Sequence, residues 1–172
     1  TEIFSDLEKS HKFKNDWKIF WAKTLMFDAL IGNTDRHQDN WGIIKNDEMR
    51  IAPVFDNGTS MGSEIFSKNF QLFDVPSYIE KYVSKGKHHM KWSLEDKTQG
   101  HFELLQKLIC QFPETYLIMI NLLNTINHQT FKHILDDLTQ FQVPVPLSIE
   151  RAHFMLKLLQ FRRQRLLNKL EK

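Results

Sequence analysis

The sequence predicts a mainly α-helical domain that carries one small β-hairpin. Three observations support this fold class: apolar residues recur at helical spacing from position 16 to 31, two short apolar runs follow with a turn between them, and apolar residues again recur at helical spacing after position 100. The chain has 172 residues, 41% of them hydrophobic, which is enough for one domain with its own core.

The first predicted helix is DWKIFWAKTLMFDALI, residues 16–31. Asn15 or Asp16 can cap its start, because both residue types accept hydrogen bonds from free backbone N–H groups. Gly32 can end it by adopting a positive φ. The aromatic residues expected in the core are Trp17, Trp21 and Phe27.

Two short apolar runs, residues 41–44 and 49–55, follow this helix and are separated by KNDE. Partly β-branched runs joined by a turn of polar residues predict a β-hairpin. A loop, DNGTSMGSE, comes next, and a mixed segment over residues 65–85 includes a short helix from Ser77.

The remainder of the chain predicts four more helices. Three have the sequences HFELLQKLICQF, ETYLIMINLLNTI and TFKHILDDLTQF. The last is expected to start after Ser148 as N-cap and to run to Leu170.

Composition limits the class of protein further. The net charge of +2 argues neither for nor against a nucleic-acid partner, and we expect no direct nucleic-acid binding. One cysteine excludes an internal disulfide and suits a reducing compartment, so we expect a cytoplasmic protein. No apolar run reaches membrane-spanning length, no signal-peptide pattern opens the chain, and residues 1–14 are expected to be a linker.

Polar residues gather where the first helix should end, in LIGNTDRHQDNWGII. Phosphoryl transfer needs a carboxylate beside the attacking hydroxyl, and hard oxygen ligands that hold Mg²⁺ on the phosphates. Asp35 can supply the carboxylate, and Asn40 and Asp56 can supply the oxygen ligands. A hairpin between Asn40 and Asp56 would carry the chain out and back, and so bring these two residues together.

NTDRHQDN followed by PVFDNG resembles the catalytic loop and the metal-binding loop of HipA-like kinases. These are bacterial serine/threonine protein kinases, several of them toxins of toxin–antitoxin pairs, and they are distantly similar to phosphatidylinositol 3/4-kinases. The family loop reads roughly GNxDRHxxN. This chain matches it with Gly32, Asn33, Asp35, Arg36, His37 and Asn40.

The resemblance implies roles for single residues. Asp35 is the implied catalytic base, Asn40 and Asp56 are the implied Mg²⁺ ligands, and Asn33 and His37 belong with them to the implied ATP-binding site. For Arg36 and His37 we favour bracing of the loop, with the His37 ring packed below it and bonded to backbone. The alternative for Arg36 is pairing with an acidic or phosphorylated group. The sequence departs from protein kinases at Asn57, where they have phenylalanine.

The resemblance also implies that residues 1–172 form the C-terminal lobe of a kinase. The chain opens on Thr1 and carries no glycine-rich phosphate loop with its lysine, so we expect the N-terminal lobe on a missing segment or a second polypeptide. The implied partners are a protein substrate and either an antitoxin or that separate lobe. The sequence does not specify the substrate.

Two alternatives stay open. One is a lipid kinase, because phosphatidylinositol kinases share the DRHxxN loop and the basic run KGKHHMKW could bind phosphate. By default we expect this run to be a solvated loop, and binding of an acidic substrate segment is a further interpretation. The other is a non-catalytic binding or regulatory module. The C-terminal run FRRQRLLNK is expected to form a helix face exposed to solvent. The alternative is that this face binds an acidic partner or nucleic acid.

Overall fold

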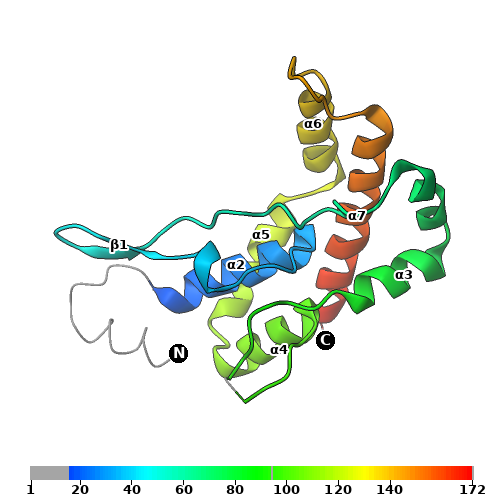
Figure 1. Ribbon diagram of the computed structural model, residues 1–172. Helices are drawn as coiled ribbons and strands as arrows, with labels where there is room; N and C mark the ends of the chain where they lie inside the picture. Colours follow the sequence, from blue (N-terminus) through cyan, green and yellow to red (C-terminus); the bar gives the residue numbers. More distant parts are fainter. Residues whose placement is uncertain (1–15, 94, 172) are drawn as a thin grey trace.

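The computed structural model describes residues 16–93 and 95–171, so the expectations for residues 1–14 and Asn15 lie outside the described residues. The fold is mainly α with one two-stranded antiparallel sheet, as predicted (Figure 1). Within the described part of the chain, no helix combines the length and apolar character needed to cross a membrane. The elements are α2 (Trp17–Ile31), η1 (Gln38–Asn40), β1 (Ile43–Lys45), β2 (Met49–Ile51), η2 (Ser67–Asp74), α3 (Pro76–Lys85), α4 (His101–Gln111), α5 (Thr115–Thr125), α6 (His128–Thr139) and α7 (Ile149–Leu170).

Helix α2 begins and ends where the sequence predicts. The Asp16 carboxylate accepts hydrogen bonds from the backbone N–H groups of Lys18 (3.0 Å) and Ile19 (3.2 Å). Gly32 follows the last turn with φ of 73°, in the left-handed region that favours glycine. Both predicted caps are therefore confirmed.

The aromatic residues of α2 divide between its two faces. Trp17 and Trp21 are buried, at 6% and 5% exposure, but Phe27 is 37% exposed, so the prediction that Phe27 lies in the core is wrong. Phe27 stands four residues after the exposed Lys23, and residues at that spacing share one helix face. Since the other faces of α2 are covered, this narrow stripe is its side toward solvent.

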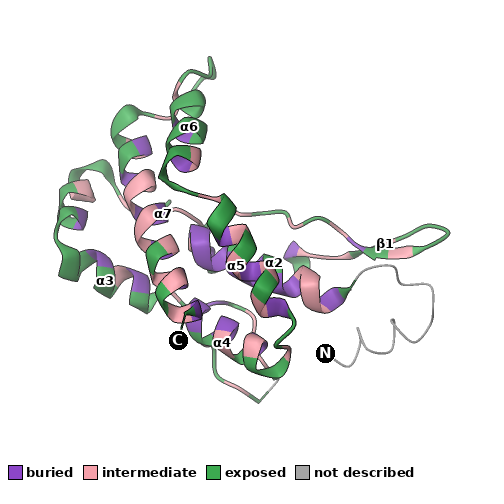
Figure 2. Cartoon of the chain, turned by 180° about the vertical axis from the view of Figure 1, so that it is seen from behind, coloured by how far each residue is buried: buried purple, intermediate pink, exposed green. Residues whose placement is uncertain are grey.

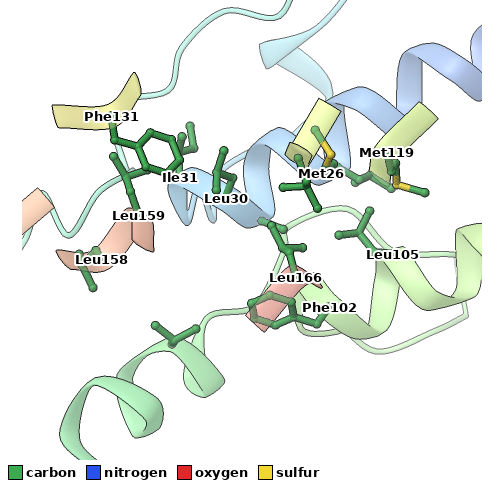
Figure 3. Packing of buried hydrophobic residues seen from close by; sticks show 14 of the residues in the cluster. Met26, Leu30, Ile31, Phe102, Leu105, Met119, Phe131, Leu158, Leu159 and Leu166 are labelled. Carbon is green, nitrogen blue, oxygen red and sulfur yellow. The ribbon is translucent and has the colours of Figure 1, made fainter. Parts of the chain in front are cut away.

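Helix α2 is the centre of the core. It packs against α4, α5 and α7, so other helices surround most of its length. In Figure 3, Met26 and Leu30 of α2 lie among Leu105 of α4, Met119 of α5 and Leu166 of α7. Figure 2 shows that α2 is mostly buried, whereas the outer helices α3 and α6 each expose one face. Burial of α2 fixes the point from which the next loop leaves.

The β-hairpin projects from the helical body (Figure 1). Its strands are three residues each, shorter than the apolar runs that predicted them, and pair Ile43 with Ile51. The backbone N–H of Ala52 donates to the carbonyl of Gly42 (2.8 Å), which extends the pairing toward the body. Ile51 is buried with Trp17 and Trp21 in a second small apolar cluster. This cluster anchors the hairpin base to α2.

The C-terminal helix does not present the solvated basic face expected of FRRQRLLNK. Arg162 is 4% exposed and donates to the carbonyl of Ala29 in α2 (3.1 Å). Arg163 donates to the carbonyl of Leu123 in α5 (2.9 Å), and Arg165 pairs with a glutamate of α3. The expectation is corrected because α7 packs against several helices, and its arginines meet groups on three of them, α2, α3 and α5.

Candidate active site

The loop after α2 leaves the helix in a fixed direction. Its first residue, Asn33, donates its backbone N–H to the carbonyl of Asp28 (2.9 Å), and the carbonyl of Ile31 accepts from Met61 (2.7 Å). A Cβ at Gly32 would lie 2.7 Å from the guanidinium carbon of Arg162, so both space and φ require glycine there. Arg162 in turn places a positive charge at the C-terminal, electronegative end of α2.

The Asp28 carboxylate is the buried centre of the site. It is 0% exposed. Its Oδ1 accepts from Arg36 Nη2 (2.8 Å) and Asn33 Nδ2 (3.1 Å). Its Oδ2 accepts from Arg36 Nε (3.1 Å) and lies 3.0 Å from His88 Nε2. The carboxylate thus joins α2, the loop that follows it and the distant basic run.

The charge state of Asp28 follows from these contacts. Burial by itself would raise the pKa of this carboxyl, because it penalises the charged form. The hydrogen bonds from His88 and Arg36 outweigh burial, and the pKa of Asp28 lies below its ordinary value. Asp28 is therefore an anion that holds the guanidinium of Arg36 in place.

Arg36 fastens two loops to each other. Its side chain is 0% exposed, and a single nitrogen, Nη1, donates to the carbonyl of Asn40 (3.2 Å) and to that of Phe55 (2.5 Å). Its Nη2 donates to Asn57 Oδ1 (2.5 Å) as well as to Asp28. The bracing interpretation of Arg36 is confirmed. Asn57, the departure from protein kinases, provides one of the contacts.

Asp35 is held by its backbone while its side chain stays accessible. Its N–H donates to Asn33 Oδ1 (3.1 Å), and its carbonyl accepts from Asn40 Nδ2 (2.6 Å). The side chain is 44% exposed, and its Oδ1 lies 4.0 Å from His37 Nε2 and 3.9 Å from His89 Nδ1. A fixed backbone with an exposed carboxylate is the arrangement that a general base needs.

Asn40 ends the short helix η1 and is 4% exposed. Its amide nitrogen is used by the Asp35 carbonyl, which orients the carboxamide through a protein contact. A carboxamide binds metal through its oxygen, and the donor contact fixes which end is nitrogen.

Asp56 lies between Phe55 and Asn57, two of the residues that Arg36 binds. Its φ is 52°, one of the two non-glycine positive values among residues 16–93 and 95–171. Such a backbone is uncommon for residues with a side chain and often marks a functional position. Through its contacts with Asn40 and Phe55, Arg36 ties the backbone next to Asp56 to the loop that carries Asp35 and Asn40. That the side chains of Asn40 and Asp56 meet stays a prediction.

The other two predicted site residues occupy different settings. Asn33 is 0% exposed, and its carboxamide oxygen accepts from Asp35 and from Thr59 Oγ1 (2.9 Å), so its side chain ties the two loops together. His37 caps η1, with Nδ1 accepting from the backbone of Asp39 (3.2 Å). The hydrogen bond to backbone agrees with the expected bracing role, but the ring is 27% exposed and lies beside Asp35 rather than below the loop.

Sequence reasoning missed the residues that support the site from within. His88 is 1% exposed and bound to Asp28, although the run that contains it was expected to be a solvated loop by default. His101 is 1% exposed, and its Nε2 donates to the carbonyl of Asn33 (2.6 Å). One signal was available: Asp28 stands on the apolar face of its helix, and a buried acid requires a partner.

His101 is neutral near pH 7. Burial lowers its pKa to about 4, although the hydrogen bond to Asn33 acts in the opposite direction. In the neutral ring, Nε2 carries the proton that it donates. Nδ1 is buried without a hydrogen-bond partner among the described residues. A neutral ring here avoids a second positive charge near the buried guanidinium of Arg162, which also disfavours protonation of His101.

Two of the predicted site residues have side chains of the kind that bind magnesium. The carboxamide of Asn40 and the carboxylate of Asp56 are hard oxygen ligands. Residues 16–93 and 95–171 contain no group of three or more His, Cys, Asp or Glu side chains that could hold a metal. Mg²⁺ is usually bound by one or two protein ligands and completes its shell with water and phosphate. Asn40 and Asp56 are therefore residues that could hold Mg²⁺.

Comparison with known proteins identifies a similar kinase. No family model matches the chain. The serine/threonine-protein kinase CtkA of Helicobacter pylori strain J99 is 40% identical in an alignment 79 residues long, and this alignment covers 37% of this chain and 24% of CtkA. The chain is homologous to that kinase over this segment.

The structural comparison covers more of the chain. The crystal structure of a Helicobacter pylori proinflammatory kinase, CtkA, matches with a TM-score of 0.72 at 21% identity, over 89% of this chain and 52% of that one. The mostly helical fold with its small sheet is therefore the fold found in CtkA. The chain spans about half the length of the CtkA structure that it matches.

Proposed function

We propose that this chain is the C-terminal lobe of an ATP-dependent serine/threonine protein kinase. The observation that carries the proposal is the clamp made by Arg36, whose Nη1 donates both to Asn40 and to Phe55, next to Asp56. Two loops that supply a carboxylate base and oxygen ligands are thereby held together. The homology to CtkA, a serine/threonine kinase, supports the same reaction class.

In the proposed mechanism, Asp35 accepts a hydrogen bond from the hydroxyl of a serine or threonine on a protein substrate. The hydroxyl oxygen attacks the terminal phosphorus of ATP, its proton passes to Asp35, and ADP leaves. Asn40 and Asp56 would hold the metal. Bound Mg²⁺ supplies charge neutralisation as the phosphoryl group moves. Asn33 and His37 keep the loop of Asp35 in the required shape.

Asp35→Asn in the full-length protein tests the proposal. The matched control is Asp39→Asn, since Asp39 lies in the same loop and its side chain is 76% exposed. We expect transfer of the γ-phosphoryl group from ATP to fall at least about 100-fold in the first variant, the contribution typical of a general base, and to stay near wild type in the second. Undiminished transfer by Asp35→Asn would refute the assignment.

We also propose that nucleotide binding requires a second lobe, as in the HipA-like kinases that the loop sequence resembles. The glycines of the chain stand at positions 32, 42, 58, 62, 86 and 100 and form no phosphate-covering loop. Titration of Mg·ATP into the 172-residue chain should give weak or no binding, and clear binding should appear once the second lobe is restored. Tight binding by the chain alone would contradict this. Failure to bind in both forms would favour a non-catalytic module.

A role as the toxin of a toxin–antitoxin pair in the cytoplasm belongs to the same proposal, with an antitoxin as partner. Its support is the resemblance of the loop sequence to HipA-like kinases. The second candidate function is a lipid kinase, favoured by the basic run that lies beside Asp35. Phosphorylation of a phosphoinositide without phosphorylation of protein would favour that function.

A further inference from the structure

The basic run that begins at the last residue of α3 carries a concentration of positive charge close to Asp35. Residues 85–91, called here the basic segment, contain Lys85, Lys87 and Lys91 and no acidic residue. All three lysines are exposed, and none forms an ion pair with another residue in the described part of the chain. The segment therefore presents three positive charges to solvent within seven residues.

The basic segment is held in place at its middle. His88 uses both ring nitrogens: Nε2 meets Asp28 Oδ2 (3.0 Å), and Nδ1 accepts from the backbone of Met90 (3.1 Å). The backbone N–H of His88 donates to the carbonyl of Gln99 (2.9 Å), next to the bridge between Lys87 and Gly100. Because successive side chains of extended backbone point to opposite sides, burial of His88 turns its two neighbours outward. The positive surface is consequently preformed.

The outward face of the basic segment lies beside the loop that carries Asp35. His89, the residue after the buried anchor, has its Nδ1 3.9 Å from Asp35 Oδ1. Its ring centre lies 5.6 Å from that of His37, which is itself 4.0 Å from the same carboxylate oxygen. A hydroxyl that reaches Asp35 must therefore be carried by a substrate that passes close to the basic segment.

We propose that the basic segment recognises acidic side chains close to the phosphoacceptor serine or threonine of a protein substrate. This inference rests on the proposed kinase function and names its substrate class. The lysines supply point charges for aspartate or glutamate of the substrate. His89, between Lys87 and Lys91, places the segment beside Asp35 and hence beside the acceptor hydroxyl. Recognition is electrostatic and should weaken with salt, because exposed charges are screened.

The surface fits a peptide better than a membrane. The basic segment exposes no large apolar side chain, because Met90, like Trp92 just after the segment, is only partly exposed and packs against the buried core. Recognition of anionic lipid by charge alone is typical of clusters of about four to eight lysines or arginines, more than the three here. A phosphoinositide is accordingly an alternative that the experiment below excludes or supports.

The experiment compares the full-length protein with two charge-reversed variants. The test variant is Lys85→Glu/Lys87→Glu/Lys91→Glu. The control makes the same change of charge at three exposed lysines outside the basic segment and outside α3, at positions 23, 45 and 68. The substrates are a serine peptide with flanking aspartates and the same peptide with alanines. A third peptide, with aspartates and alanine in place of the serine, reports binding by fluorescence anisotropy without any reaction.

We expect the wild type and the control to prefer the acidic peptide through a lower KM. The test variant should lose this preference, with a rise in KM of about two- to five-fold for each lysine, the range of exposed ion pairs. The values of kcat and of the KM for ATP should stay unchanged. Anisotropy should show that the acidic peptide binds to the wild type and the control and not to the test variant.

Several results would overturn the inference. Phosphorylation without acidic preference would refute it and leave the kinase function intact. A rise in the KM for ATP would assign the lysines to the nucleotide. Binding to vesicles that contain phosphatidylinositol bisphosphate, without binding to the acidic peptide, would assign them to lipid. Binding of the acidic peptide without phosphorylation of any substrate would instead support the recognition surface and refute the proposed kinase function.

Discussion

Replacing Asp28 with asparagine tests whether the buried carboxylate organises the site. Arg36 donates two hydrogen bonds to it, at 2.8 and 3.1 Å, and Asn33 and His88 each provide one more contact. Asparagine has the same shape, but it removes the negative charge and puts an NH₂ group where an acceptor stood. At least one donor then faces another donor, and the guanidinium of Arg36 remains buried without a counter-charge.

The expected loss of stability follows from these contacts. Removing one partner of a buried ion pair costs about 3–5 kcal/mol. The remaining amide oxygen can still accept one hydrogen bond, which retains about 1 kcal/mol. We therefore expect Asp28→Asn to lower the free energy of unfolding by about 3 kcal/mol. Since a domain is stabilised by about 5–15 kcal/mol in total, this is a large fraction.

Urea denaturation followed by tryptophan fluorescence at pH 7 measures the effect. Asp96→Asn is the matched control, because Asp96 forms a partly exposed pair with Lys107 (3.4 Å) that should contribute less than about 1 kcal/mol. A loss in Asp28→Asn no larger than in the control would refute the reasoning. The double variant Asp28→Leu/Arg36→Met removes both charges and should be more stable than Asp28→Asn.

The pH dependence gives an independent check on Asp28. Its pKa is lowered in the folded protein, so the unfolded chain takes up the proton first as the pH falls. The stabilising contribution is therefore complete above the unfolded pKa of about 4 and is lost as the pH falls through the folded pKa. The decline of stability with acid should be smaller in Asp28→Asn. Identical decline in both proteins would show that Asp28 is not the titrating group.

The remaining predictions concern His101 and Gly32. Because the pKa of His101 is about 4 when folded and 6.5 when unfolded, stability should fall by up to about 3 kcal/mol as the pH drops between these values. His101→Gln should flatten that part of the curve in urea denaturation, and equal slopes would contradict the prediction. Gly32→Ala forces a Cβ against Arg162 at positive φ and should cost at least about 1–2 kcal/mol in the same assay. Gly42→Ala, where nothing lies within 4 Å, should be near neutral, and equal costs at both glycines would refute the steric argument.

Much of the fold could be predicted from local sequence signals. Asp16 and Gly32 mark the ends of α2, and Ser148 caps the start of α7, because each acts on backbone groups a few residues away. Phe27 shows the limit of such signals. Its aromatic side chain favours burial, but which stripe of α2 faces solvent depends on where the other helices pack.

Some residues of the candidate site could be predicted from local sequence, and others could not. The residues proposed for chemistry, Asp35, Asn40 and Asp56, could be chosen because phosphoryl transfer requires those groups and a recognisable loop carries them. The buried residues that hold them in place could not be chosen from the sequence. Asp28 and His88 are sixty residues apart, and no short spacing indicates that they meet.

The sequence by itself determined the helix boundaries, the hairpin and the residue types that phosphoryl transfer would use, because these depend on backbone capping, periodicity and functional-group chemistry within short segments. Only the tertiary structure decided that Arg36 would be buried between two loops, that the arginines of α7 would meet other helices, and that the basic segment would lie at Asp35. These outcomes depend on contacts between distant segments. A buried charge is stable only where the folded chain brings its partner to it.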